Sequence, residues 1–286
     1  MTRRSGGRYH WSMSTIAIMM ALAIAATAPE GPAEKARDEA GHETFPAGEV
    51  LVYRVKFSWF SAGTATMAVY KVEDVEGVEG LRGQKIIMRT VSHGLARRIM
   101  RVDDVATTWI DPSTAGTVYY RFDKSEEDKR EVETLLPVPG GKVEYYRKKS
   151  SGKEGRASIE PVGDGPPVDT LSMFYYLRTV DLKLNEPVSV TVYQDKAYPL
   201  ELTPVSMERV KVLRVGTFNA FKVRPKAAAP GLFSKEGDAT FWLEEKTHVL
   251  LRMVLDVKYG SSSMCLARVK NSPLLSAPGG PEHEKK

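Results

Sequence analysis

The chain has 286 residues, of which 41 are basic and 36 acidic, and its formal net charge is +5. Its single cysteine, Cys265, excludes an intrachain disulfide, so stability must come from a hydrophobic core. Three of the basic residues, Arg3, Arg4 and Arg8, lie in the first 28 residues, and without them 38 basic residues face 36 acidic ones, a net charge near +2. We therefore expect no nucleic-acid partner.

The first 28 residues have the pattern of a secretory signal peptide. Basic residues come first, and the apolar run Met13–Ala26 that follows is short for a membrane span. Small residues permit cleavage after Ala28 or, because Pro29 hinders that cut, after Ala25. We expect residues 1–28 to be a signal peptide and the protein to be periplasmic, whereas an uncleaved segment would anchor it to the membrane.

Polar stretches flank a single candidate domain. Residues 29–44 contain Pro and Gly and have no apolar periodicity, which predicts a flexible tether. Residues 271–286 have the same character and predict a disordered tail. Residues 45–270 show no repeat period and no long linker, so we expect one β-rich domain there.

Period-two patterns dominate residues 45–270. At the start of the domain Arg54 and Lys56 alternate with apolar side chains that share one face, namely Leu51, Tyr53, Val55, Phe57 and Trp59. Ser61-Ala62-Gly63 is the predicted connection to a partner strand. Similar runs recur between turn-forming residues, which predicts a mainly β fold, a curved antiparallel sheet or half-barrel of about 11–14 strands.

One segment, at about 169–181, has the pattern of a helix. Asp169 is a natural N-cap, and apolar side chains cover most of the circumference, namely Leu171, Phe174, Tyr175 and Leu177. Ser172 and Arg178 are the positions expected to face solvent. We expect this helix to be largely buried against the concave face of the sheet.

Three segments in order resemble the bacterial exported family known as domain of unknown function 3108. They are FPAGEVLVYRVKFSWFSAGTATM at the start, VDTLSMFYYLR in the middle and GDATFWLEEKTHVLLRMVLDVKYGSSSMCLARV near the end. The middle segment is the most specific, and in the last one Val249-Leu250 stand where the family commonly has a proline. The resemblance covers about 45–270 and implies a β-rich periplasmic domain with no established reaction.

Patterns typical of catalytic and metal sites are missing from the sequence. His93 and His248 are the histidines of the domain, and we expect both in loops. The chain has no nucleophile elbow, H-E-x-x-H motif, calcium loop or P-loop. We expect no cofactor, no metal and no enzymatic activity, with a hydrolase of envelope polymer that uses two converging carboxylates as a remote alternative.

Basic residues cluster at two places, Arg97-Arg98 with Arg101 and residues 145–149. The second cluster mixes aromatic and cationic side chains, which suits an anionic polymer or a lipid headgroup. An ordinary solvated strand face explains the same pattern.

A buried helix over a curved sheet favours a binding or carrier module for a lipid-like or other amphiphilic ligand. The candidate ligand-binding residues are Trp59, Asp169, Phe174, Tyr175, Arg178 and Trp242. A structural role is the alternative for each, as helix cap for Asp169, as dipole partner for Arg178, and as core for the aromatic residues including Tyr176. A second hypothesis is an envelope scaffold that docks a partner protein through exposed strand edges.

Overall fold

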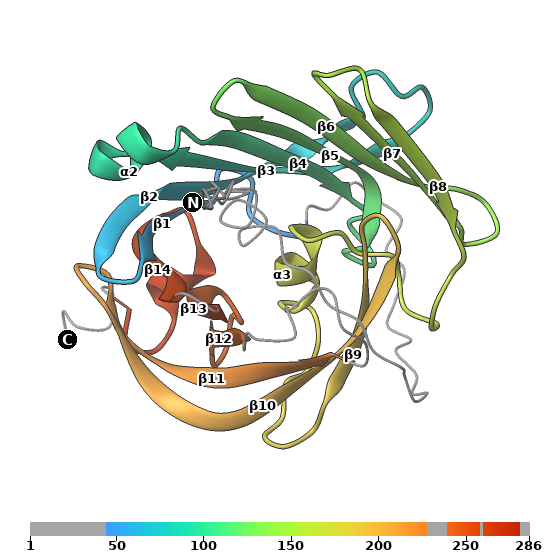
Figure 1. The fold of residues 1–286 in the computed structure, drawn as a ribbon. Coiled ribbons are helices and arrows are strands. Elements are labelled where there is room, and N and C mark those ends of the chain that lie inside the picture. The colour runs from blue at the N-terminus through green and yellow to red at the C-terminus, as the bar shows by residue number, and fades with distance from the viewer. Residues whose placement is uncertain (1–43, 228–238, 258–259, 281–286) are drawn as a thin grey trace, which may run out of the picture.

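The computed structural model describes residues 44–227, 239–257 and 260–280. The expected signal peptide and nearly all of the expected tether lie outside these residues. The described chain forms one antiparallel sheet of 14 strands that curves around its own concave face without closing into a barrel (Figure 1). The expected fold class is confirmed.

The strands of the first half are β1 (Val50–Phe57), β2 (Phe60–Asp74), β3 (Arg82–Ser92), β4 (Asp103–Ile110), β5 (Thr117–Glu126), β6 (Lys129–Pro137), β7 (Val143–Lys149) and β8 (Glu154–Ile159). Those of the second half are β9 (Val188–Tyr193), β10 (Ala197–Val212), β11 (Gly216–Ala227), β12 (Ala239–Glu244), β13 (Leu250–Val257) and β14 (Gly260–Lys270). The helices are α2 (Gly94–Ile99), α3 (Ser172–Tyr176) and a 3-10 turn, η1 (Pro273–Ser276).

The strands form a meander in which the first and the last strand, β1 and β14, pair in the middle of the sheet. From β1 the sheet runs in chain order to β8, and from β14 it runs backwards to β9. The pairing of β1 with β14 connects the two halves, so β8 and β9 are the sheet edges. The connection between these edges carries α3 into the concavity (Figure 1).

The first hairpin confirms the alternation but not the expected turn. Leu51, Tyr53 and Val55 are buried on one face of β1. Phe57 pairs with Phe60, so the connection is Ser58-Trp59, and Trp59 is exposed rather than in the core. The expected turn glycine, Gly63, lies inside β2, where a Cβ would come within 2.2 Å of a backbone carbonyl oxygen of β3. A need for close strand packing, not a turn, explains that glycine.

The expected helix is real but much shorter than 169–181. After α3 ends, Arg178 N and Thr179 N donate to carbonyls three residues back, so the chain continues in turns. The prediction that Ser172 and Arg178 face solvent is wrong, because Ser172 is fully buried and the Arg178 side chain is 6% exposed. Each has a buried polar partner that the helical pattern does not reveal.

Two further segments differ from expectation. α2 lies where we expected a loop, and its side chains are not buried. Residues 271–280 were expected to be disordered, but η1 begins there and Leu274 is fully buried. Ser272 caps η1 by accepting from Leu274 N, and Gly279 O accepts from Thr217 N of β11. These bonds hold the segment against the sheet.

Candidate functional site

A pocket opens on the concave face beneath α3. Its cavity volume is about 40 Å³, or about 550 Å³ when the adjoining open solvent is counted. Side chains of β2–β5, β13, β14 and the α3 segment line it, namely Met67, Met88, Thr90, Asp104, Ala106, Tyr120, Phe122, Thr170, Leu171, Phe174, Met253 and Met264. We call this the methionine pocket, because methionines line it from strands on both sides of β1, namely β2 and β3 on one side and β13 and β14 on the other.

The α3 segment forms one wall of the methionine pocket. Phe174 packs edge-on against Phe241 of β12, with ring centroids 5.6 Å apart. The hydroxyl groups of Thr170 and Tyr120 lie 3.3 Å apart, within hydrogen-bonding distance. Aromatic contact and this polar contact therefore fix the wall against both halves of the sheet.

Asp169 attaches the α3 segment to β4 and β5. Its Oδ2 accepts from the hydroxyls of Thr108 and Thr117, at 2.6 and 2.7 Å. Its Oδ1 accepts from the backbone N–H groups of Leu171 and Ser172, which satisfies donors of the first helical turn as expected of a cap. The carboxylate is fully buried and saturated, so its contacts are structural.

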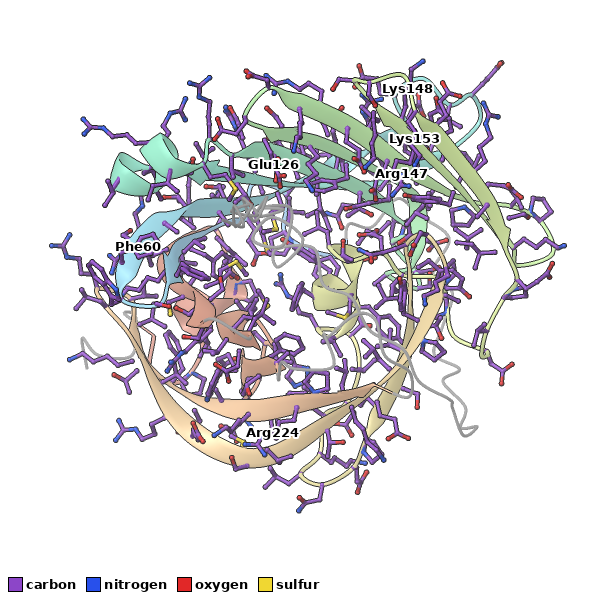
Figure 2. The ribbon with its side chains drawn as sticks, in the orientation of Figure 1. Phe60, Glu126, Arg147, Lys148, Lys153 and Arg224 are labelled. Atoms are coloured by element: carbon purple, nitrogen blue, oxygen red, sulfur yellow. The ribbon has the colours of Figure 1, made fainter. Side chains whose placement is uncertain are left out.

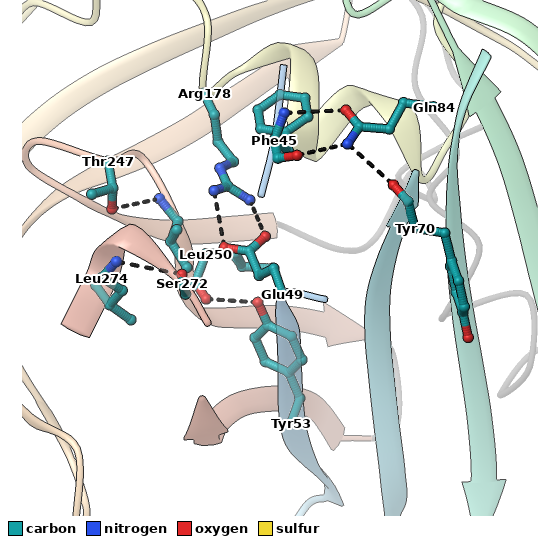
Figure 3. A network of polar contacts seen from close by, with 11 residues as sticks. Phe45, Glu49, Tyr53, Tyr70, Gln84, Arg178, Thr247, Leu250, Ser272 and Leu274 are labelled. Atoms are coloured by element: carbon teal, nitrogen blue, oxygen red, sulfur yellow. Dashed lines mark hydrogen bonds and ion pairs between the residues drawn. The ribbon is translucent and has the colours of Figure 1, made fainter. Parts of the chain in front are cut away.

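A buried ion pair lies beside α3 (Figure 3). Arg178 donates to both carboxylate oxygens of Glu49, at 2.6 and 3.1 Å, and the Glu49 side chain is completely buried. The guanidinium also lies over the rings of Phe45 and Tyr175, 4.8 and 5.2 Å from their centroids. Burial raises the pKa of the Tyr175 phenol, whose hydroxyl has no hydrogen-bond partner among the described residues.

Further polar contacts close the same end of the concavity. Gln84 Nε2 donates to Phe45 O, and Tyr53 OH donates to Leu250 O (Figure 3). A ring nitrogen of His248 lies 3.0 Å from Leu177 O, and burial lowers the pKa of this histidine. We call this region, where β1 begins, the helix end of the sheet. Of its polar contacts, those of Arg178 with Glu49 and of His248 with Leu177 hold the α3 segment, whereas Gln84 binds the backbone of Phe45.

Charged side chains continue the concave face beyond the methionine pocket. Lys124 and Glu126 share the inward side of β5 with Phe122, and cross-strand pairing places β6 and β7 residues beside them. We name this set the inner charged cluster: Asp104, Lys124, Glu126, Glu131, Glu133, Arg147 and Lys149. Figure 2 labels Glu126 and Arg147 on this part of the wall. Lys149 Nζ lies 3.0 Å from Glu131 Oε2, and Lys124 Nζ lies 3.3 Å from Glu126 Oε1.

The carboxylates of the inner charged cluster have shifted pKa values. Burial, then the neighbouring Glu131 carboxylate, raises the pKa of Glu133 to about 7. Burial also raises the pKa values of Glu126 and Asp104. Burial opposes ionisation of Glu131 too, but the Lys149 ammonium lowers its pKa. Such shifted groups beside a pocket mark a candidate site.

Neither a metal centre nor a spanning helix is found in the part of the chain that the structure describes. Within residues 44–227, 239–257 and 260–280, no three His, Cys, Asp or Glu side chains are grouped so as to hold a metal ion. No helix among these residues has the length and hydropathy needed to cross a membrane.

A family model described as "Protein of unknown function (DUF3108)" matches residues 52–266. The chain belongs to the DUF3108 family. The match runs from within β1 to within β14 and includes α3 and both walls of the methionine pocket. No curated protein matches the chain.

Solved structures with related strand arrangements match most of the DUF3108 chain. A β-barrel-like protein of domain of unknown function DUF1849 from Brucella abortus is 11% identical, with 79% of this chain and 98% of that chain covered and a TM-score of 0.48. A protein described as exported, with a YmcC-like fold, from Bacteroides fragilis is 12% identical, with coverages of 80% and 98% and a TM-score of 0.32. A protein described as a lipoprotein from Parabacteroides distasonis is 14% identical, with coverages of 81% and 100% and a TM-score of 0.31. All three TM-scores lie below 0.5, so these likenesses decide nothing about function.

The DUF3108 fold separates the residues that the sequence suggested as ligand-binding. Phe174 lines the methionine pocket, whereas Asp169, Tyr175 and Arg178 lie behind it in the buried contacts of the helix end. Trp59 is far from these residues, in the exposed β1–β2 turn.

Trp242 lies on the other side of the sheet from the methionine pocket. The adjacent Phe241 contacts Phe174 inside, so Trp242 points to the convex face. There its Nε1 donates to Glu208 at 2.8 Å, and the cations of Lys222 and Arg252 lie over its ring. Trp242 also lines a second pocket of about 230 Å³, together with Glu208, Leu251, Arg252 and Cys265.

Arg147 and Lys149 of the inner charged cluster lie within residues 145–149, which the sequence pattern indicated, whereas the pocket methionines and the carboxylates of the cluster were not predicted as site residues. Alternation along β5 could have found part of the cluster, since Lys124 and Glu126 follow Tyr120 and Phe122 at a spacing of two. The methionines lie on strands far apart in sequence, and only the joining of β1 to β14 brings their walls together.

Proposed function

We propose that this DUF3108 protein is a non-enzymatic binding or carrier module for a lipid-like amphiphile. The observation that carries the proposal is the methionine pocket, an apolar space beside a helix whose position is fixed by buried contacts. Methionine side chains are flexible and polarisable, so they adapt to acyl chains of different length and curvature.

The inner charged cluster supplies the polar counterpart that an amphiphile needs. Asp104 belongs to both the pocket lining and the cluster, so the apolar and charged surfaces are continuous. Arg147 and Lys149 are partly exposed, with side-chain exposures of 34% and 40%. In this proposal the ligand's apolar chain lies among the methionines and its polar group lies toward these cations.

Location in the cell envelope is part of the proposal. Its support is the pattern of residues 1–28, with basic residues, a short apolar run and small residues in the order of a secretory signal. N-terminal sequencing of the protein isolated from cells tests this part, with Ala26 or Pro29 expected first. An intact Met1 would contradict cleavage and support a membrane-anchored form.

An envelope scaffold is the second candidate, because the structure leaves strand β8 at a sheet edge. Within the described residues β8 pairs with β7 alone, and its side chains alternate between exposed and half-buried. Such an edge is suited to pairing with a strand of a partner protein. This candidate requires no ligand in the methionine pocket.

A fluorescent fatty-acid probe, 11-(dansylamino)undecanoic acid, tests the carrier proposal on the full protein. We expect saturable binding that the variant Met88→Trp weakens at least tenfold, because the larger ring fills the pocket. Met207→Trp is the matched control, since Met207 on β10 does not line the pocket. Thermal unfolding of both variants checks that they fold.

Native mass spectrometry of the protein isolated from cells gives a second readout. A bound species in the mass range of a lipid, lost in the folded Met88→Trp variant, would support the carrier. Absence of bound lipid together with no probe binding by the wild-type protein would overturn it and favour the scaffold.

A further inference from the structure

Three large apolar side chains are exposed in the β1–β2 turn and in α2, away from the helix end. Trp59 in the β1–β2 turn is 87% exposed, and Leu95 and Ile99 of α2 are 61% and 57% exposed. An exposed tryptophan leaves apolar surface in water, which is unfavourable, and no contact in the isolated protein offsets this cost. A surface that gathers exposed apolar side chains is a candidate interaction site.

The β2 strand holds α2 beside the β1–β2 turn. His93, directly before α2, donates its backbone N–H to Ala62 O at 3.0 Å, and its ring Nε2 lies 3.1 Å from Thr64 Oγ1. Ala62 is two residues beyond Phe60, whose ring packs edge-on against Trp59. Figure 1 shows α2 next to β2, on the side of the sheet where β1 turns into β2.

The same surface carries exposed arginines. Arg97 and Arg98 lie in α2, Arg101 follows it after Met100, and all three arginines are exposed. We call these arginines with Trp59, Leu95 and Ile99 the arginine-tryptophan rim.

Acidic groups near the rim are already engaged. Asp103 forms a two-point contact with Arg89, at 2.8 Å for each bond. Glu127 Oε1 accepts from the backbone N–H of Arg101, and Arg130 donates to Glu127 O. The basic residues on and around the rim, Arg89, Arg97, Arg98, Arg101 and Arg130, outnumber the acidic Asp103, Glu127 and Asp128.

The rim lies at the opposite end of the sheet from α3. β1 begins at Val50, next to the Glu49 that holds Arg178, and it ends at Phe57, so the turn is roughly 25 Å away at 3.3 Å per residue. The groups that hold α3 are thus remote from the rim. A partner on the rim can contact the protein without disturbing them.

We infer that the arginine-tryptophan rim docks on the surface of a membrane that contains anionic lipid. Tryptophan is favoured at the level of the headgroups, where its ring is partly buried and its N–H keeps polar partners. Leucine and isoleucine add apolar area on the same side, as in interfacial helices. Each arginine near an anionic surface strengthens partition by roughly fivefold.

Membrane docking goes beyond the proposed carrier function and does not depend on it. A protein with an empty methionine pocket would still present the rim, because none of the rim residues lines that pocket. Vesicle binding and probe binding are therefore separable measurements.

Tryptophan fluorescence with vesicles tests the inference. Trp59 is exposed whereas Trp109 and Trp242 are buried, so the difference between wild-type and Trp59→Phe spectra reports on Trp59. We expect this difference spectrum to shift to the blue with vesicles of phosphatidylcholine and phosphatidylglycerol in a 7:3 ratio. Vesicles of phosphatidylcholine alone should produce little shift.

Variants sharpen the test by changing the rim without touching buried contacts. Arg97→Glu combined with Arg98→Glu should weaken partition into anionic vesicles at least tenfold. The matched control is Leu213→Glu, since Leu213 is also 60% exposed but lies in the β10–β11 turn, near the end of the sheet where β14 finishes. It should bind as the wild type does.

Any of three results would overturn the inference. One is a Trp59 spectrum that does not respond to anionic vesicles. The others are a response of equal size with neutral vesicles and an equal loss in the Leu213→Glu control, because either shows that the rim and its charge do not direct binding.

Discussion

The helix end and the inner charged cluster both contain charged side chains, but they use them differently. At the helix end Arg178 and Glu49 form one two-point pair with side chains 6% and 0% exposed. In the inner charged cluster Arg147 and Lys149 are partly exposed, Asp104 and Glu126 are buried, and the pKa of Glu133 is raised to about 7. Arg178 and Glu49 satisfy each other and leave no group for a ligand, whereas the partly exposed cations of the cluster are accessible to one.

Asp169 and Glu126 differ in the same way, in the number of hydrogen bonds that each carboxylate accepts. Asp169 accepts from two hydroxyls and two backbone N–H groups. Glu126 has an ion-pair contact with Lys124 but its Oε1 accepts no hydrogen bond among the described residues. The carboxylate with all of its partners is structural, although the sequence marked it as a site residue.

The largest expected effect comes from breaking the buried ion pair. Arg178→Met leaves the Glu49 carboxylate buried without its partner and should lower the free energy of unfolding by about 3–5 kcal/mol. Glu49→Leu combined with Arg178→Met should recover much of this loss, because no uncompensated charge stays behind. Urea denaturation measures both.

The control for the ion pair is Arg82→Met, which removes an exposed contact to Asp74 and should cost about 0.5 kcal/mol or less. An equal loss in Arg178→Met and Arg82→Met would contradict the distinction between the helix end and the surface.

A smaller effect is expected at Asp169. Asp169→Asn replaces an acceptor with an amide that opposes the hydroxyl donors of Thr108 and Thr117, so the free energy of unfolding should fall by about 2–3 kcal/mol. Asp181→Asn, at an exposed side chain, is the control. Thermal unfolding monitored by circular dichroism measures both variants. An unchanged melting temperature in Asp169→Asn would contradict the structural role of Asp169.

The smallest effect is a pH dependence from the inner charged cluster. The pKa of Glu133 is about 7 in the folded protein and near 4.5 when unperturbed, so the folded state holds an extra proton between these values. The contribution of Glu133 to stability is then fully present below pH 4.5, its unperturbed pKa, and is lost as the pH rises through about 7. Because the side chain is partly solvated, we expect a decrease of about 1–2 kcal/mol.

Glu133→Gln should flatten that pH dependence, as measured by urea denaturation between pH 5 and about pH 8. Glu79→Gln, at an exposed position, should leave the wild-type slope in place. A slope that persists in Glu133→Gln would assign the titration to another group of the cluster.

Strand formation was predictable because it depends on local alternation. Leu51, Tyr53 and Val55 are buried as their spacing of two requires. The same rule failed at Trp59, where the chain had already turned, because a two-residue connection with Ser58 at φ 50° carries no glycine to mark it.

The helix prediction failed in a different way. An apolar circumference predicts burial but not length, and the turns after Leu177 extend the apolar run without extending the helix. Ser172 and Arg178 look solvent-facing in the pattern because their partners, Thr117 and Glu49, lie more than 50 residues away in the chain.

The sequence by itself determined the mainly β architecture, a helical segment beginning near Asp169 and membership of the DUF3108 family, because these depend on spacing and short ordered motifs. Tertiary structure alone decided that methionines of β2, β3, β13 and β14 share a pocket, and that Trp59 and α2 share a rim. The physical reason is the pairing of β1 with β14, which joins the two halves of the chain into one curved sheet and sets side chains from distant segments on one face.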